Sequence, residues 1–323
     1  MTSEAKLRLK NPARFAGVLL AGACALVGNP CFAAPSVERL DPKLDAILSA
    51  SATLERLYVD EKGFFEGPTW IEGKPGYLIV ADIPGNTLYR IDGRDHVTPL
   101  LADIQSGTQA SFFDKPRGRY MLGPNGTTLA PDGRLAYCVF GGGRIESLDL
   151  KTHQRAVLVS EADGKPLAHP NDLVYGPGGD LYFTTDTAVY RLHGGKAQRV
   201  TDKIAPNGLA FSPDRRRMYA TDDPNRLVVY DVGGDGLLTN QRPFATLSGD
   251  VEVSHVDGVR VDRHGNVFAV GPEGIWILTS DGQHIGTIHA TAKRFSNLEF
   301  GGAHAEELFL TAPEGVYRLR LKP

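Results

Sequence analysis

A short motif recurs six times along this chain of 323 residues. Each copy begins with an oxygen-bearing residue, usually followed by Gly or Asp, a few alternating apolar residues, a turn rich in Pro, Asp and Gly, and a second β-rich run. The copies begin at Glu66, Asn125, Asn171, Asn207, Asp257 and Asn297, so they are spaced by 36 to 59 residues. That spacing is typical of four-stranded propeller blades joined by loops of variable length.

Sheets of this kind bury both faces only against neighbouring copies, so the repeats predict a closed ring. The expected fold is all-β, a six-bladed β-propeller with a central metal site, over residues 54–323. The strand-like run 54–59 precedes the first copy and is expected to complete the last blade. Residues 34–53 are predicted to form an arm or short helix outside the ring. The 37 Gly and 21 Pro agree with many strand reversals.

The N-terminal segment has the composition of a secretory signal peptide. Four basic residues between positions 6 and 14 precede the apolar stretch 15–27, and residues 31–33 fit a small-x-small cleavage site. Residues 1–33 are therefore expected to be removed, which predicts a periplasmic or secreted protein with no membrane segment after cleavage. Cys138 would then be the only cysteine, and its apolar surroundings predict a buried structural residue rather than a nucleophile.

The charge balance argues against a polyanionic partner. A net charge of −3 and a pI near 6.3 lack the basic excess of nucleic-acid-binding proteins. The run Gly141-Gly142-Gly143 lacks the strand-to-helix context of a phosphate loop, and no serine lies in a Gly-x-Ser-x-Gly elbow. The expected partner is a small molecule, and the oligomeric state stays open.

The first position of the motif is expected to face the channel, because the first residues of each inner strand of a propeller point inward. Two carboxylates and four amides would then converge on one axis. Hard cations take such oxygen ligands, whereas Zn²⁺ favours His and Cys. The pattern predicts one divalent cation, with Ca²⁺ as the expected ion and Zn²⁺ or Mn²⁺ as alternatives. The competing interpretation is that Asn or Asp before Gly only forms a turn.

Four sequence blocks occur in a fixed order: residues 66–70; residues 171–174 with 182–186; residues 206–214 with Tyr219; and residues 257–262 with 265–266. Together they resemble the gluconolactonase, regucalcin (SMP-30) and lactonohydrolase family, over nearly the whole chain after position 33. The resemblance implies a metal-dependent hydrolase that opens a small lactone or related ester.

The resemblance also implies roles for individual residues. Glu66, Asn207 and Asp257 match the positions of metal ligands, and Asn171, which matches an asparagine that approaches the metal or the substrate, is predicted as a fourth ligand. Asp257 in addition matches the general base that takes a proton from water, while the cation polarises the lactone carbonyl. A hydroxide formed on the cation is the alternative description of the same step, and the sequence does not separate the two.

Substrate contacts are expected from Asn125, Asn171 and His169. Sugar-lactone members of the family often carry arginine two residues before the first Asn of the second block, where this chain has His169. His169 is expected either to hydrogen-bond the substrate or to fill the rim of the site. Asp172 is predicted to be structural, and the insertion 107–121 to fold over the channel as a lid. His255 is predicted to be a loop histidine, with a position at the channel mouth, two residues before Asp257, as the alternative.

Two alternatives remain beside the lactonase. The first is a non-enzymatic propeller that binds a metal or small ligand and in which Ca²⁺ is structural. The second is a different reaction at the same site, on sugar acids or aromatic esters, since fold and metal do not fix a substrate. Which lactone is opened also stays open.

Overall fold

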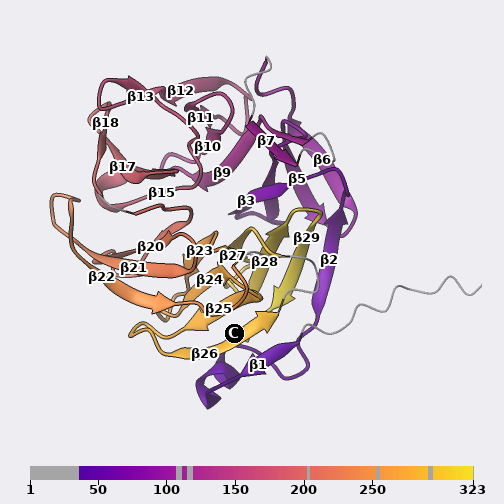
Figure 1. The fold of residues 1–323 in the computed structure, drawn as a ribbon. Helices are drawn as coiled ribbons and strands as arrows, with labels where there is room; N and C mark the ends of the chain where they lie inside the picture. Colours follow the sequence, from indigo (N-terminus) through magenta and orange to yellow (C-terminus); the bar gives the residue numbers. More distant parts are fainter. Residues whose placement is uncertain are drawn as a thin grey trace, which may run out of the picture. The chain divides into compact units, whose positions relative to one another are not determined.

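The computed structural model describes residues 36–106, 111–114, 119–201, 204–251, 255–289 and 294–322. These residues form six sheets that follow one another around a ring in sequence order (Figure 1). Within these ranges the helices are two short 3₁₀ turns, η1 (Pro42–Ala46) and η3 (Pro177–Gly179). The predicted signal peptide, residues 1–33, lies outside the described residues and stays a prediction. The all-β, six-bladed propeller is confirmed.

Each blade is an antiparallel sheet whose strands follow one another in order from the channel to the outside of the ring. Blade 1 holds β3 (Phe65–Ile71), β4 (Tyr77–Asp82), β5 (Thr87–Gly93) and β6 (His96–Leu101). Blade 2 holds β9 (Pro124–Leu129), β10 (Leu135–Val139), β11 (Arg144–Leu148) and β12 (Arg155–Val159). Blade 3 holds β15 (Leu173–Tyr175), β16 (Leu181–Thr185), β17 (Ala188–His193) and β18 (Lys196–Arg199).

The second half of the ring repeats this plan. Blade 4 holds β19 (Leu209–Phe211), β20 (Arg217–Asp222), β21 (Arg226–Val232) and β22 (Leu238–Thr246). Blade 5 holds β23 (Val259–Val261), β24 (Val267–Gly271), β25 (Gly274–Leu278) and β26 (His284–His289). Blade 6 holds β27 (Asn297–Gly301), β28 (Glu307–Ala312), β29 (Gly315–Arg320) and β2 (Leu54–Val59). The inner strands contact one another around the ring, and β27 returns to β3.

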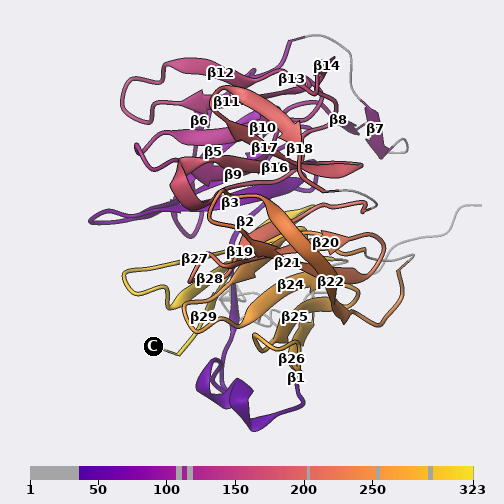
Figure 2. The same ribbon diagram turned by 90° about the vertical axis from the view of Figure 1, so that its left-hand side faces the viewer.

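The ring is closed by a strand from near the start of the described chain. β2 pairs antiparallel with β29, with Leu54 opposite Leu319, so the predicted completion of the last blade is confirmed. The segment before it also joins the fold. β1 (Val37–Arg39) pairs with β26 as a fifth strand of blade 5, and η1 follows it at the edge of the structure (Figure 2). Blades 5 and 6 are thereby linked by one continuous piece of chain.

The buried apolar residues of the described chain form six clusters, one between each pair of neighbouring blades. Strand periodicity explains how one strand serves two clusters. In β10, Ala136 and Cys138 pack toward blade 3, whereas Tyr137 and Val139 pack toward blade 1. Cys138 is fully buried, and burial raises the pKa of its thiol, so it packs as the structural residue that its apolar context predicts.

Two small hairpins lie outside the blades: β7 (Ser111–Asp114) with β8 (Arg119–Met121), and β13 (Glu161–Ala162) with β14 (Lys165–Pro166). The first belongs to the insertion predicted as a lid. Residues 107–110 and 115–118 of that insertion lie outside the described residues, so the lid stays a prediction. Met121, at the end of β8, lines the pocket described below.

Gly208, at the second motif position of blade 4, allows two neighbouring inner strands to pack closely. The Gly208 amide donates to the Asp257 carbonyl oxygen of the next blade at 3.2 Å. A Cβ atom on Gly208 would lie 2.5 Å from that oxygen and 2.7 Å from Gly258 Cα, both backbone atoms of blade 5. Adjacent inner strands therefore approach too closely at this point for any side chain.

Replacing Gly208 by Ala is expected to lower the free energy of unfolding by about 1–3 kcal/mol, because the backbone of blade 5 would have to move. The matched control is Gly93→Ala at the end of β5, where an added Cβ has no neighbour within 4 Å. We expect the control to change stability by less than about 1 kcal/mol. Urea denaturation of both variants measures the difference, and equal effects would contradict this explanation of the motif.

Candidate functional site

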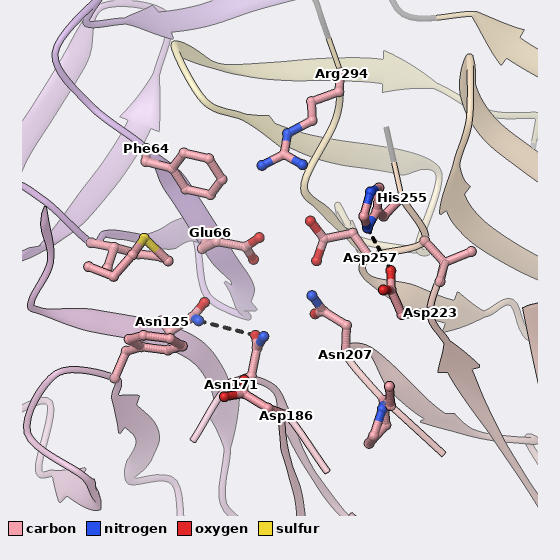
Figure 3. Close-up of a pocket in the computed structure, with 16 residues that line it drawn as sticks. Phe64, Glu66, Asn125, Asn171, Asp186, Asn207, Asp223, His255, Asp257 and Arg294 are labelled. Carbon is pink, nitrogen blue, oxygen red and sulfur yellow. Dashed lines mark hydrogen bonds and ion pairs between the residues drawn. The ribbon is translucent and has the colours of Figure 1, made fainter. Parts of the chain in front are cut away.

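A pocket of about 510 Å³ opens among the inner strands. The first motif residues of blades 1 to 5 all line it: Glu66, Asn125, Asn171, Asn207 and Asp257. Figure 3 shows these side chains converging from different blades, with Glu66 and Asp257 facing each other. The structure thus brings together the four residues predicted as metal ligands, and it places Asn125 beside Asn171.

The sixth blade departs from the predicted register by one residue. The Gly208 amide of blade 4 donates to the carbonyl oxygen of Asp257, the first motif residue of blade 5. In the same way, the Gly258 amide of blade 5 donates to the carbonyl oxygen of Ser296 in blade 6. Ser296, rather than Asn297, therefore occupies the first motif position of blade 6, and the sequence alignment of this copy was wrong. Asn297 is shifted away from the pocket, and its Nδ2 donates to Glu66 Oε2 at 3.1 Å.

The two carboxylates are almost completely buried. Glu66 is 4% exposed and Asp257 is 8% exposed. Burial raises the pKa of Glu66 to about 7, although the Gly67 amide and Asn297 oppose the shift. Burial, and then the charge of Glu66, raise the pKa of Asp257 well above its usual range. Two buried acids facing each other disfavour ionisation unless a cation lies between them.

The amides complete a set of oxygen donors. Asn125 Nδ2 donates to Asn171 Oδ1 at 3.1 Å, which fixes the two side chains relative to each other. Two buried oxygens, Asn125 Oδ1 and Asp257 Oδ1, have no hydrogen-bond partner among the described residues. Buried acceptors without partners are rare in folded proteins and require an explanation. A bound cation would provide one.

The residues present fit a hard divalent cation. In the described ranges, no cluster of three or more His, Cys, Asp and Glu side chains could hold a metal. Any ion here would therefore rely on amide oxygens as well as on the two carboxylates. Such a mixed set of oxygen ligands suits Ca²⁺ better than Zn²⁺. The pocket also has room for water or substrate to complete the coordination of the ion.

His169 lies beside the pocket, but it is not among the residues that line it. Its ring stacks on Phe140 with a centroid distance of 4.7 Å and an interplanar angle of 3°. Its Nδ1 lies 2.9 Å from Asp186 Oδ2. Phe140 and Asp186 both line the pocket, so His169 contacts two lining residues without lining the pocket itself.

Residues 64–314 match the SMP-30/gluconolactonase/LRE-like region. The chain belongs to this family. It is 30% identical to a gluconolactonase of Zymomonas mobilis, in an alignment that covers 88% of this chain and 86% of that protein. The gluconolactonase XC5397 of Xanthomonas campestris superposes with a TM-score of 0.74 at 28% identity, covering 89% and 97% of the two chains. A calcium-binding regucalcin of Agrobacterium tumefaciens has a TM-score of 0.65 at 20% identity, covering 83% and 94%.

Three pocket residues of this SMP-30/gluconolactonase family member were not found from the sequence. Phe64 and Arg294 line the pocket, as does Asp223. His255 was predicted to be a loop histidine, with a place at the channel mouth as the alternative; it lies in a loop and also lines the pocket, with its Nδ1 2.7 Å from Asp223 Oδ1. Position within the motif could have found Phe64, which lies two residues before Glu66 just as His255 lies two residues before Asp257.

A second buried charge cluster lies among the inner strands of this family member. Arg260 Nη1 lies 3.4 Å from Asp172 Oδ2, and Arg260 Nε lies 3.2 Å from Glu299 Oε2. Asp172 is fully buried and also accepts a hydrogen bond from the Leu173 amide. The structural role predicted for Asp172 agrees with these contacts, which join blades 3, 5 and 6.

No helix of the described residues is long and apolar enough to span a membrane.

Proposed function

We propose that this protein is a metal-dependent hydrolase that opens a small lactone. The observation that carries the proposal is the buried pair of carboxylates, Glu66 and Asp257, which face each other with Asp257 Oδ1 unpartnered. Relatives described as gluconolactonases, one of them 30% identical over most of the chain, support the choice of reaction. The regucalcin relative, described as calcium-binding, agrees with a divalent cation.

The side chains divide the work between holding the ion and moving a proton. Glu66, Asn171, Asn207 and Asp257 would hold a divalent cation, preferably Ca²⁺. When bound, the cation polarises a lactone carbonyl and stabilises the negative charge that develops on its oxygen. Asn297 and the Gly67 amide orient Glu66, because both donate to its Oε2, at 3.1 and 3.0 Å.

Asp257 would act as the general base. It would take a proton from the attacking water as the water oxygen forms a bond to the carbonyl carbon. The ring C–O bond then breaks, and the departing ring oxygen takes up that proton, giving a hydroxy acid. Asn125 and Asn171 are held to each other at the same pocket and would orient the substrate by hydrogen bonds.

The test is hydrolysis of gluconolactone, γ-butyrolactone and dihydrocoumarin by the purified protein, with the spontaneous rate subtracted. We expect turnover of at least one substrate to disappear on chelation and to return when Ca²⁺, or failing that Mn²⁺ or Zn²⁺, is added. Turnover that survives complete metal removal would contradict metal dependence. A metal-loaded protein that hydrolyses no lactone would favour the binding propeller with a structural ion.

A further inference from the structure

The corrected register of blade 6 reveals a second set of residues around the pocket. Phe64, His255 and Arg294 each lie two residues before the first motif residue of their blade, and all three line the pocket. Two residues of extended chain span about 6–7 Å. These side chains would therefore surround the part of a substrate that extends beyond the carbonyl group, if the carbonyl group lies near the carboxylates Glu66 and Asp257.

Arg294 is the only lysine or arginine among the described residues that line the pocket. Its guanidinium carbon lies 5.4 Å from the centre of the Phe64 ring, a cation–π distance that restricts where the charge can be. The positive charge of Arg294 also lowers the pKa of both Glu66 and Asp257, so it faces the reaction centre rather than the outer surface.

The pocket is electrically asymmetric. Figure 3 shows Arg294 and Phe64 on one side of the facing carboxylates and Asp186 on the opposite side, with Asp223 next to His255. Asp186 and Asp223 are carboxylates at the rim, each in contact with a histidine ring nitrogen. Carboxylates accept hydrogen bonds from hydroxyl groups, whereas a guanidinium pairs with an anionic group, often through two parallel hydrogen bonds.

We propose that Arg294 is a specificity-determining residue that selects a polyhydroxylated lactone carrying a second acid group, a carboxylate or sulfonate, at the end far from the lactone carbonyl. Arg294 pairs with that acid group, Phe64 holds the guanidinium in place, and Asp186 and Asp223 accept hydrogen bonds from hydroxyl groups. This inference rests on the proposed lactonase function and adds the substrate class to it.

Two lactones that differ at one group isolate the effect of the acid group. Glucaro-1,4-lactone and glucono-1,4-lactone share the same ring and hydroxyl pattern, and they differ only in a terminal carboxylate in place of a hydroxymethyl group. We expect the wild-type kcat/KM to be at least about tenfold higher for glucaro-1,4-lactone, a factor within the range of charge-assisted hydrogen bonds. In Arg294→Met this preference should disappear because KM for glucaro-1,4-lactone rises. Arg294→Lys should keep part of the preference.

The matched control is Arg134→Met, an exposed arginine paired with Asp132 in a turn of blade 2, which should keep the wild-type preference. If Arg294 only balanced the charge of the carboxylates, Arg294→Met would change both substrates equally and shift metal affinity. Hydrolysis of both lactones without preference would overturn this proposal and leave the lactonase intact.

Binding measurements decide the matter if neither of these two lactones is hydrolysed, an outcome that leaves the proposed function to be decided by the wider panel of lactones. Calorimetric titration of the Ca²⁺-loaded protein with each lactone should then show tighter binding of glucaro-1,4-lactone, weakened by Arg294→Met. Equal affinities for the two lactones would overturn the inference independently of turnover.

Discussion

Asp257→Asn is expected to lower kcat/KM for lactone hydrolysis by about a thousandfold, within the range that a positioned general base contributes. Asparagine has the same shape and keeps one oxygen that can face the ion, but it cannot take a proton from water. The loss should therefore appear mainly in kcat. Steady-state kinetics under saturating Ca²⁺, with bound metal measured on the same samples, separates the loss of the base from the loss of the ion.

The matched control for Asp257 is Asp214→Asn, an exposed carboxylate in a turn of blade 4 that accepts from the Arg216 amide. It should retain full activity. If Asp257→Asn keeps its metal and more than a tenth of the wild-type kcat/KM, Asp257 is not the base. The metal-activated water that the sequence left as an alternative would then be the better description of the attack.

The sequence predicts the ring and most of its centre, because both follow from repetition. A residue that recurs at the first position of successive inner strands must lie near the axis once the strands close into a ring. This logic placed Glu66, Asn125, Asn171, Asn207 and Asp257 around one pocket, where the structure has them. It also placed β2 beside β29, since an open last blade would leave a bare strand edge.

The same reasoning was wrong in blade 6, whose copy of the motif departs most from the others. Blade 6 has Ser296-Asn297 where the other blades have Glu, Asn or Asp followed by Gly or Asp, and the sequence offered Asn297 as the obvious match. The backbone hydrogen bond from Gly258 to Ser296 reveals the true register. The error hid Arg294, because its position relative to the motif depends on where blade 6 begins.

The rim was harder to predict for a physical reason. Its residues lie on the chain leading into the inner strands, or after the second strand of a blade, and nothing in the strand repeat constrains their type. Asp223 contacts His255, and Asp186 contacts His169, across 32 and 17 residues of sequence. Such pairs depend on how loops meet at the pocket, which the spacing of the motif does not determine.

Glu66→Gln is expected to have opposite effects on stability with and without metal. In the metal-free wild type, burial raises the pKa of Glu66 from 4.5 to about 7. An acid whose folded pKa lies above its unfolded pKa stabilises the fold at low pH, and that contribution is lost as the pH rises through about 7. At about pH 8 in chelator, Glu66→Gln should therefore be more stable than the wild type, by at most on the order of 3 kcal/mol.

The order should reverse in Ca²⁺, because a neutral amide is a weaker ligand than a carboxylate and the variant gains less from binding. Below about pH 4.5 in chelator the two proteins should be equally stable, since Glu66 is then protonated in both its folded and unfolded states. Denaturation midpoints at low and high pH, each with chelator and with Ca²⁺, test all three statements.

Exposed Glu161→Gln is the control and should follow the wild type throughout. A Glu66→Gln variant that Ca²⁺ stabilises as much as the wild type would remove Glu66 from the ligand set, because a buried carboxylate that holds a divalent ion cannot be replaced by an amide without weakening the binding.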